Sequence, residues 1–404
     1  MGRSSGLVTG DTGARPSRVV PRLGPLPWPK IKHVMIFHVS RFLHKIHLGK
    51  LAPARRFEFR SLPIPPGSNH EAEAMAPFAG LAAPIVSNVH VCHDRRSRYF
   101  LSGNSLVAPQ ASEEFVGRIG RSDGYGNALR QSETVIWVKF KASTDSLARA
   151  ISIPTWAPHN HFHWTINCLS ALVDLPPRES EWAGAPILIP PASRLPPHFR
   201  LVLETLAPEF SLKELPETRF LPVQRMLVLG SGAPLQSAVV HRKGASLQFI
   251  TRRGSLLRYR EFLAEKLGTQ ATQVRPIGER VVLARDHMFT RAKDQAALHK
   301  AAEGHGFVVH FANRYSMAEN SVKLSRAKEV IGSHGANWAE FIHCARGARG
   351  LLFKDSRTLQ KGNWFQQLAI ALEASIEEVE VQGQASFESK IADWLNQPNT
   401  HHEA

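Results

Sequence analysis

Short apolar runs that alternate with amphipathic helical stretches constrain the fold of this chain more than any other feature. Two of the intervening stretches, Leu247–Leu267 and Lys293–Glu303, have helical periodicity. Apolar strands that alternate with helices indicate parallel sheets covered by helices on both faces, so the sequence predicts an α/β fold. The predicted strands are Val86–Val91, Thr134–Val138, Ile187–Ile189, Met226–Leu229, Val281–Leu283, Phe307–Val309, Val330–Ile331 and Leu351–Phe353.

A helix stop and a polar stretch divide the α/β region. Gly268 predicts the end of a helix, and residues 270–278 are typical of a linker. We therefore expect two α/β domains with flanking segments: a basic leader and amphipathic segment over residues 1–80, an N-terminal α/β domain over residues 81–270, a C-terminal α/β domain over residues 279–385, and a tail over residues 386–404.

The net charge of +16 is concentrated near the N-terminus. Residues 1–60 contain twelve basic and two acidic residues, a net +10, which leaves +6 for the other 344 residues. The high overall charge therefore argues for nucleic-acid binding in one terminal segment only, and we expect no nucleic-acid partner.

Residues 31–48 have the pattern of a basic amphipathic helix. Apolar residues recur at helical spacing, whereas Lys32, Arg41 and Lys45 lie on other faces. Such a helix either lies on an anionic membrane surface or packs on the body of the protein, and both interpretations stay open. The five prolines in residues 1–30 predict a disordered leader. The apolar residues are Ile31, Met35, Val39, Phe42 and Ile46.

Cysteine usage and hydropathy bear on the compartment. Cys92, Cys168 and Cys344 are too far apart and too few for a disulfide framework or a zinc ribbon. No apolar run has the 18 or so residues that span a bilayer, and the first 25 residues lack the apolar core of a secretory signal. We expect a cytoplasmic protein, peripheral at the inner face of the cell membrane.

The first motif with chemical potential is His159–Trp164, with the sequence HNHFHW. On a strand, its three alternating histidines would share one face and could hold a metal, but no fourth ligand is near, so we expect no metal site. In the preferred interpretation, Asn160 caps a helix and His163 lies in its first turn, at the mouth of a cleft. An ordinary cap with surface histidines is the simplest alternative. The buried stripe of this helix would be Trp164, Cys168, Leu169 and Leu172.

The second motif, Ala327–Cys344, has the pattern of a strand, a tight turn and a helix. Its small residues Ser333, Gly335 and Ala336, with His334, fall where the strand ends and the helix begins. There the free amides and the helix dipole attract phosphate, and ligands bind at this edge of a parallel sheet. The spacing fits neither GxGxxG nor GxxxxGK[ST], which argues against NAD and Walker-type ATP sites.

Taken together, these motifs resemble those of glycosyltransferase family 61, over about residues 85–375. The family pattern of asparagine, two residues and His-Trp is matched by Asn160, His163 and Trp164. The remaining matches are Arg285, Arg291 and Asp294 in an arginine-rich segment, Gly306 and Phe307 at a strand start, Glu319 and Asn320 for a Glu-Gln pair, and Gly332 to Ala336 for a Gly-His-Gly-Ala turn.

The chain departs from this pattern at several positions. Asp294 and Gln295 replace an Asn-Glu pair, and Asn320 replaces a glutamine. Glu340 stands where an asparagine is usual, and Phe353 where an acidic residue often ends the strand. These departures bear on donor recognition and leave a divergent substrate or a weakened enzyme open.

The resemblance implies a GT-B type α/β fold, in which two Rossmann-like domains face a cleft. It implies a glycosyltransferase, of the hexosyl or pentosyl type, that takes a nucleoside-diphosphate sugar donor and a saccharide acceptor in polysaccharide, capsule or glycan assembly. The resemblance also implies inverting transfer. We expect no metal or other cofactor, because the sequence lacks the DxD carboxylates that hold Mg²⁺ or Mn²⁺ against a diphosphate.

Each motif then has an expected role. Arg285 and Arg291 would pair with the diphosphate, together with His334 and the amides of the turn Ser333, His334, Gly335, Ala336 and Asn337. Glu319 would accept from ribose or sugar hydroxyls. His163 would be the catalytic base, with Glu340 as an alternative, and Asn160 and Trp164 would have acceptor-side or structural roles.

Two functions of other classes stay open. One is a non-catalytic protein that binds acidic polysaccharide or nucleic acid through its basic surface, with strong salt dependence. The other is an inactive relative that assists an active transferase. Only a working donor site should be stabilised by nucleoside diphosphates.

Overall fold

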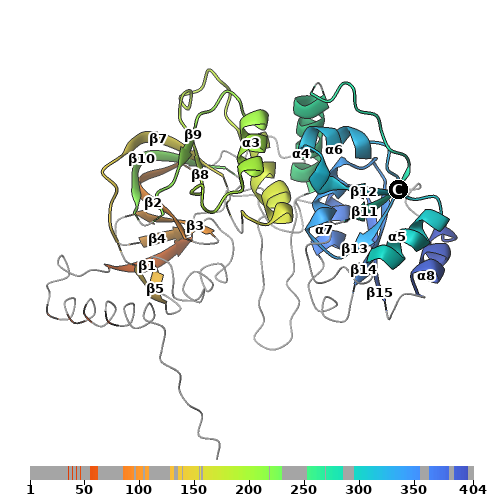
Figure 1. Cartoon of the computed structure of the whole chain (residues 1–404). Helices are drawn as coiled ribbons and strands as arrows, with labels where there is room; N and C mark the ends of the chain where they lie inside the picture. Colours follow the sequence, from red (N-terminus) through yellow and green to blue (C-terminus); the bar gives the residue numbers. More distant parts are fainter. Residues whose placement is uncertain are drawn as a thin grey trace, which may run out of the picture.

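The structure is a computed structural model, shown in Figure 1. It describes residues 85–229 apart from 95–96, 103–104, 109–127, 132–134, 139, 154, 156–157 and 218; residues 253–354 apart from 269 and 285–294; residues 55–61, 364–381 and 386–398; and the single residues Met35, Val39, Phe42 and Ile46. Within these residues, no helix combines the length and the apolar composition needed to cross a membrane.

The strands after residue 279 form a five-stranded sheet in which every neighbouring pair is parallel. Four of these strands confirm the prediction from the sequence, and β15 was not predicted. The strands are β11 (Arg280–Ala284), β12 (Val308–Phe311), β13 (Glu329–Ser333), β14 (Arg349–Lys354) and β15 (Ser375–Glu380).

Helices cover both faces of this sheet. On one face, α5 (Gln295–Gly304) and α8 (Ser386–Leu395) pack with Val282, Ile331 and Leu351. The neighbouring residues Val281, Val330 and Leu352 point to the other face. That face is covered by α4 (Arg253–Gly268), α6 (Met317–Leu324), α7 (Trp364–Ala371) and the 3₁₀ helix η6 (Ala336–His343). Because both faces are buried, successive strand positions are apolar, and this is why these strands could be predicted from the sequence.

The strand order of this sheet creates a site where ligands bind in open α/β folds. If the strands are numbered 1 to 5 along the chain, they lie side by side in the order 2-1-3-4-5, because β12 lies on one side of β11 and β13 on the other. In open α/β sheets, the connections that leave two such neighbouring strands diverge at the carboxyl edge, and ligands bind there. The turn after β13 begins at Ser333, so it lies at this switch point.

The strands before residue 229 form a ten-stranded mixed sheet, in the order β5-β6-β1-β4-β3-β2-β10-β7-β8-β9. The part from β10 to β9 is parallel, as expected. From β2 to β4 the pairing is antiparallel, contrary to the expectation. The bounds are β1 (Arg55–Ser61), β2 (Ile85–Asp94), β3 (Ser97–Ser102), β4 (Ser105–Ala108), β5 (Ala128–Gln131), β6 (Val135–Val138), β7 (Leu147–Ser152), β8 (Ile187–Ile189), β9 (Leu212–Glu214) and β10 (Leu221–Val228).

The lengths of the connections explain the antiparallel part. Only two residues separate β2 from β3 and β3 from β4, which is enough for a hairpin and far too short for a parallel crossover. Gly103 and Asn104, between β3 and β4, are typical hairpin residues and are the sequence signal for this part.

Both flanking segments contribute to the folded units. β1 lies inside the range 1–80 assigned to the leader, yet it pairs with β4 and β6. Residues 386–395 were assigned to the tail, but they form α8. Its residues Phe387, Ile391 and Trp394 recur at helical spacing and are buried against the second sheet. Residues 1–30, for which a disordered leader was predicted, and residues 399–404 lie outside the described residues.

A continuous apolar core connects the two sheets. It contains Ile151 and Ile187 from the first sheet and Val330 and Leu352 from the second. Helix α4 passes between them: it contacts α3 (Pro197–Leu206) and the 3₁₀ helix η3 (Leu169–Asp174), and also α6 and α7. Helix α4 ends at Gly268, as predicted.

The closest packing in the second sheet surrounds Gly350. A Cβ atom at this position would lie 2.9 Å from Cγ1 of Ile376 and 3.0 Å from the ring of Trp338, which is fully buried. We expect Gly350→Ala to lower the free energy of unfolding by about 1–3 kcal/mol, because the core cannot shift freely. Gly304→Ala is the matched control, since its Cβ would meet nothing within 4 Å. Urea unfolding of both variants measures the difference, and equal stability of the two would contradict this account.

Candidate active site

The first motif caps an irregular helix. Oδ1 of Asn160 accepts from the amides of Phe162 at 3.0 Å and His163 at 3.4 Å, so the expected cap is present. The helix continues as a π-helical turn, η2 (His163–Cys168), and then as η3. The expected stripe of Trp164, Cys168, Leu169 and Leu172 is buried.

His163 does not lie at the mouth of a cleft, and this expectation was wrong. Its side chain is buried, with 5% of the residue exposed, because all six residues of η2 are buried and the helix has no exposed face. Its Nδ1 donates to Oδ1 of Asn167 at 2.9 Å. Burial lowers the pKa of His163 to about 4, although the hydrogen bond to Asn167 opposes the shift. The imidazole is therefore neutral at pH 7.

The second motif is held against the switch point of the sheet. The amide of His334 donates to the carbonyl of Phe353 at 2.8 Å, so this amide is already used. Nδ2 of Asn337 donates to the carbonyl of Leu283 at 2.6 Å, which ties the start of η6 to the carboxyl end of β11. The amide of Trp338, in the first turn of η6, donates to the carbonyl of Gly335 at 3.2 Å.

The structure brings the two motifs together across 179 residues of sequence. Nε2 of His161 lies 2.5 Å from Oε1 of Glu340, which is on η6. The ring of Phe365 on α7 contacts Phe162 edge-on at 5.3 Å and His334 edge-on at 5.1 Å. The HNHFHW motif and the turn after β13 are therefore parts of one site.

Other candidate residues have different surroundings. Glu319 forms a capping box with Ser316 at the start of α6, in which its Oε2 accepts from the amide of Ser316 at 2.8 Å. This hydrogen bond lowers the pKa of the exposed Glu319 carboxyl and gives the residue a structural role. Arg285 and Arg291 lie outside the described residues, but Arg285 directly follows Ala284, the last residue of β11.

Glu340 is the center of a buried polar cluster that sequence reasoning did not assemble. Desolvation raises the pKa of Glu340, but the hydrogen bond from His161 and the electrostatic interactions with the surrounding histidines outweigh desolvation and hold the pKa below its usual value. Burial lowers the pKa values of His310 and His343, so both stay neutral near pH 7. The signal in the sequence was a lone acidic residue in the apolar stretch Ala336–Cys344.

The described residues contain no group of three or more His, Cys, Asp or Glu side chains placed to hold a metal ion. His161 and His163 have separate hydrogen-bond partners, Glu340 and Asn167. The alternating histidines therefore do not converge on one point, as the metal interpretation requires.

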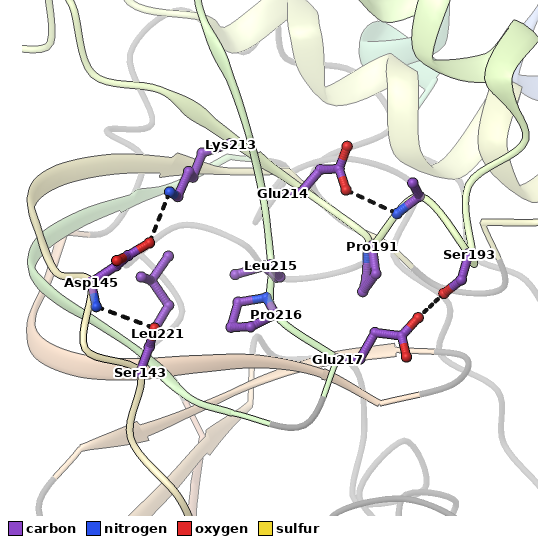
Figure 2. Close-up of a pocket in the computed structure, with 11 residues that line it drawn as sticks. Ser143, Asp145, Pro191, Ser193, Lys213, Glu214, Leu215, Pro216, Glu217 and Leu221 are labelled. Atoms are coloured by element: carbon purple, nitrogen blue, oxygen red, sulfur yellow. Dashed lines mark hydrogen bonds and ion pairs between the residues drawn. The ribbon is translucent and has the colours of Figure 1, made fainter.

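A pocket lies elsewhere, beside the end of β9, and Figure 2 shows the side chains that line it. Lys213 pairs with Asp145 at 3.3 Å, and the amide of Ala192 donates to Glu214 at 3.1 Å. Ser193 also donates to Glu217. None of the candidate site residues lines this pocket. Its charged side chains already have the partners named above, so we assign no chemistry to it.

These features define the class of protein. A parallel sheet of order 2-1-3-4-5 with a helix start at its switch point is typical of α/β proteins that bind phosphate-bearing ligands at the carboxyl edge. The family model described as Glycosyltransferase 61 matches residues 161–351, which include the first motif from His161 on and the whole of the second. This part of the chain is similar to glycosyltransferase family 61, which supports glycosyltransferase activity in general terms, with a sugar donor and an acceptor as substrates. No curated protein matches the chain.

Acid titration tests the burial of His163. Because its folded-state pKa is depressed from 6.5 to about 4, its contribution to stability is complete above pH 6.5 and is lost as the pH falls toward 4. We expect the wild type to lose about 2 kcal/mol more than His163→Gln between pH 7 and pH 5. Urea unfolding at both pH values gives this double difference, and parallel losses in the two proteins would show that His163 is accessible to protons.

Proposed function

We propose that this chain transfers a sugar from a nucleoside-diphosphate sugar to a hydroxyl group of a saccharide acceptor, with inversion and without a metal. The donor would lie at the carboxyl edge of the β11–β15 sheet, and the acceptor on the side of η2. The observation that carries the proposal is the contact between His161 and Glu340, which joins the predicted acceptor motif to the helix that follows the predicted donor turn. This is the relation expected of two GT-B domains that face one site.

The diphosphate is assigned to the turn Ser333–Asn337. Helix η6 starts there, and the positive end of a helix dipole favours phosphate at such a start. In the sequence Arg285 follows Ala284, the last residue of β11, and Asn337 of the turn is bonded to Leu283 of the same strand. Arginine pairs with phosphate through two parallel hydrogen bonds and would stabilise the charge on the departing diphosphate.

Nucleoside diphosphates test the donor site. A panel of UDP, GDP, CDP and TDP should contain at least one that stabilises the protein, by about 2.7 kcal/mol at 100 times its Kd, measured by thermal unfolding. The same panel extended to nucleotide sugars identifies the donor. If none of them has an effect, the non-catalytic alternatives replace a working transferase.

Arg285→Ala tests the assignment of the diphosphate. We expect this change to weaken binding of the nucleoside diphosphate about 10- to 100-fold, since charge-assisted hydrogen bonds contribute roughly 1.5–3 kcal/mol. Arg280→Ala is the matched control, because Arg280 begins the same strand at the opposite edge of the sheet, where it pairs with Glu329 at 2.6 Å. Equal affinity in both variants would remove Arg285 from the site.

We also propose that the segment 31–48 binds the anionic inner face of a membrane. The four described residues of this segment, Met35, Val39, Phe42 and Ile46, share one helical face and have 44–61% of their surface exposed. This exposure favours the membrane interpretation over packing on the body, and the basic residues at positions 32, 41 and 45 complement anionic lipid.

Vesicle sedimentation tests this membrane contact. Binding to vesicles of phosphatidylserine and phosphatidylcholine should exceed binding to phosphatidylcholine alone. Phe42→Asp should lower it about tenfold, because an apolar side chain leaves the lipid. Leu201→Asp is the control, since Leu201 is an exposed apolar residue of α3, outside the segment. Equal losses in both variants, or no preference for anionic lipid, would contradict the proposal.

A further inference from the structure

Glu340 is an unusual residue to bury. Its side chain is 2% exposed, and the other positions of η6 between Trp338 and Ile342 are apolar. One carboxylate oxygen accepts from His161, and the other, Oε2, has no hydrogen-bond partner among the described residues. Nε2 of His343, on a neutral ring, lies 3.7 Å from Oε2, too far for a hydrogen bond. A buried carboxylate with one donor is costly, so its presence calls for a functional explanation.

His161 differs from the other histidines of the cluster. His163, His310 and His343 are buried, whereas the side chain of His161 is 37% exposed and rests against Phe199 with ring centroids 5.8 Å apart. An ionised carboxylate only accepts hydrogen bonds, so the hydrogen lies on Nε2 of His161. Nδ1 therefore carries the lone pair, and it has no partner among the described residues.

This nitrogen lies between the two halves of the proposed site. Glu340 is four residues beyond Ala336, and at about 2 Å per residue of 3₁₀ helix this places it roughly 8 Å along η6 from the turn assigned to the diphosphate. A sugar ring would have to span this distance between the diphosphate and the imidazole. His161 itself belongs to the HNHFHW motif, and the acceptor is expected beside that motif.

We propose that His161 is the catalytic base of the transfer and that Glu340 is its positioning residue, an assignment that rests on the proposed function. Nδ1 takes the proton of the acceptor hydroxyl as its oxygen bonds to the anomeric carbon. The bond from that carbon to the diphosphate breaks, and the nucleoside diphosphate leaves with the electron pair. Glu340 keeps the ring in the required tautomer and stabilises the imidazolium without taking the proton itself.

This assignment replaces His163 as the base. His163 is buried within η2, and its Nδ1 is bonded to Asn167. Its neighbour His161 is reached by solvent and has a carboxylate partner. The charged and titratable groups facing His161 are Glu340 and His343 from η6 and His198 from α3, with Arg260 on α4 interacting with His343.

The main test compares His161→Gln with the wild type. Glutamine can still donate to Glu340 but cannot accept the proton, so the pair is kept and the base is lost. With the nucleotide sugar that the panel selects, we expect release of nucleoside diphosphate to fall about 10²- to 10⁴-fold in kcat while the Kd of the nucleoside diphosphate stays unchanged. His198→Gln, an exposed histidine beside His161, is the control and should keep the wild-type rate.

The role of Glu340 has its own readouts. In Glu340→Gln the imidazolium loses its counter-charge, so kcat should fall and the acid limb of the pH–rate profile should move to lower pH; Glu340→Asp should restore part of the rate. Nitrogen-15 NMR of the imidazoles should give the Nε2–H tautomer for His161 in the wild type. The opposite tautomer, or an unmoved acid limb in Glu340→Gln, would overturn this role.

The outcomes separate the two proposals. Wild-type rates in His161→Gln, in a protein that binds nucleoside diphosphate and releases it from the nucleotide sugar, would overturn the base assignment alone. A wild-type protein that binds no nucleoside diphosphate would overturn the proposed function, and the role of His161 with it.

Discussion

The buried side chain of Trp338 holds the site together. Its ring fills the space left by Gly332 and Gly350, where a Cβ would approach the indole to 3.4 Å and 3.0 Å. Its Nε1 donates to the carbonyl of Ser333 at 3.1 Å, so the first turn of η6 is pinned to the end of β13. Because the ring also packs near Phe341 and Phe365, the direction of η6 follows from one apolar anchor.

That anchor determines where Glu340 lies. With η6 fixed against the sheet, its buried side carries Glu340 toward η2, where His161 meets it. Phe365 contacts residues of both motifs, so this aromatic ring holds the two motifs together in the same way as the pair of His161 and Glu340. The shared core and α4 extend this connection beyond the site, and the contact between the two halves is therefore built into the packing rather than added at the surface.

The strands around the site were predictable because of how they are buried. Val281–Leu283 and Leu351–Phe353 are covered on both faces and so are apolar at every position. Strand β3, SRYFLS, belongs to an antiparallel part of the first sheet and has no such run. The turn chemistry of Gly103 and Asn104 was the better signal there, and composition alone pointed to the wrong pairing.

The sequence predicted which residues belong to each motif of the site, but not which residues of the two motifs contact each other. The cap at Asn160 and the turn at Ser333 depend on local sequence, and both were found. The burial of His163 was missed because the helical period of 3.6 residues does not apply to a π-helical turn followed by a 3₁₀ helix. The pairing of His161 with Glu340 is a long-range contact, and no spacing rule in one sequence reports it.

The departures from the family pattern separate into two kinds once their surroundings are known. Asn320 bonds His310 at 2.8 Å and the carbonyl of Ala312 at 3.0 Å, and Phe353 packs on Phe387, so both serve local packing. Glu340 serves no such purpose, since an asparagine could accept from His161 without placing a charge in the core. A carboxylate there gains most when the ring opposite becomes positive, which happens only when His161 takes a proton. On the proposed role of His161, this departure is explained by chemistry at His161 rather than by loss of activity.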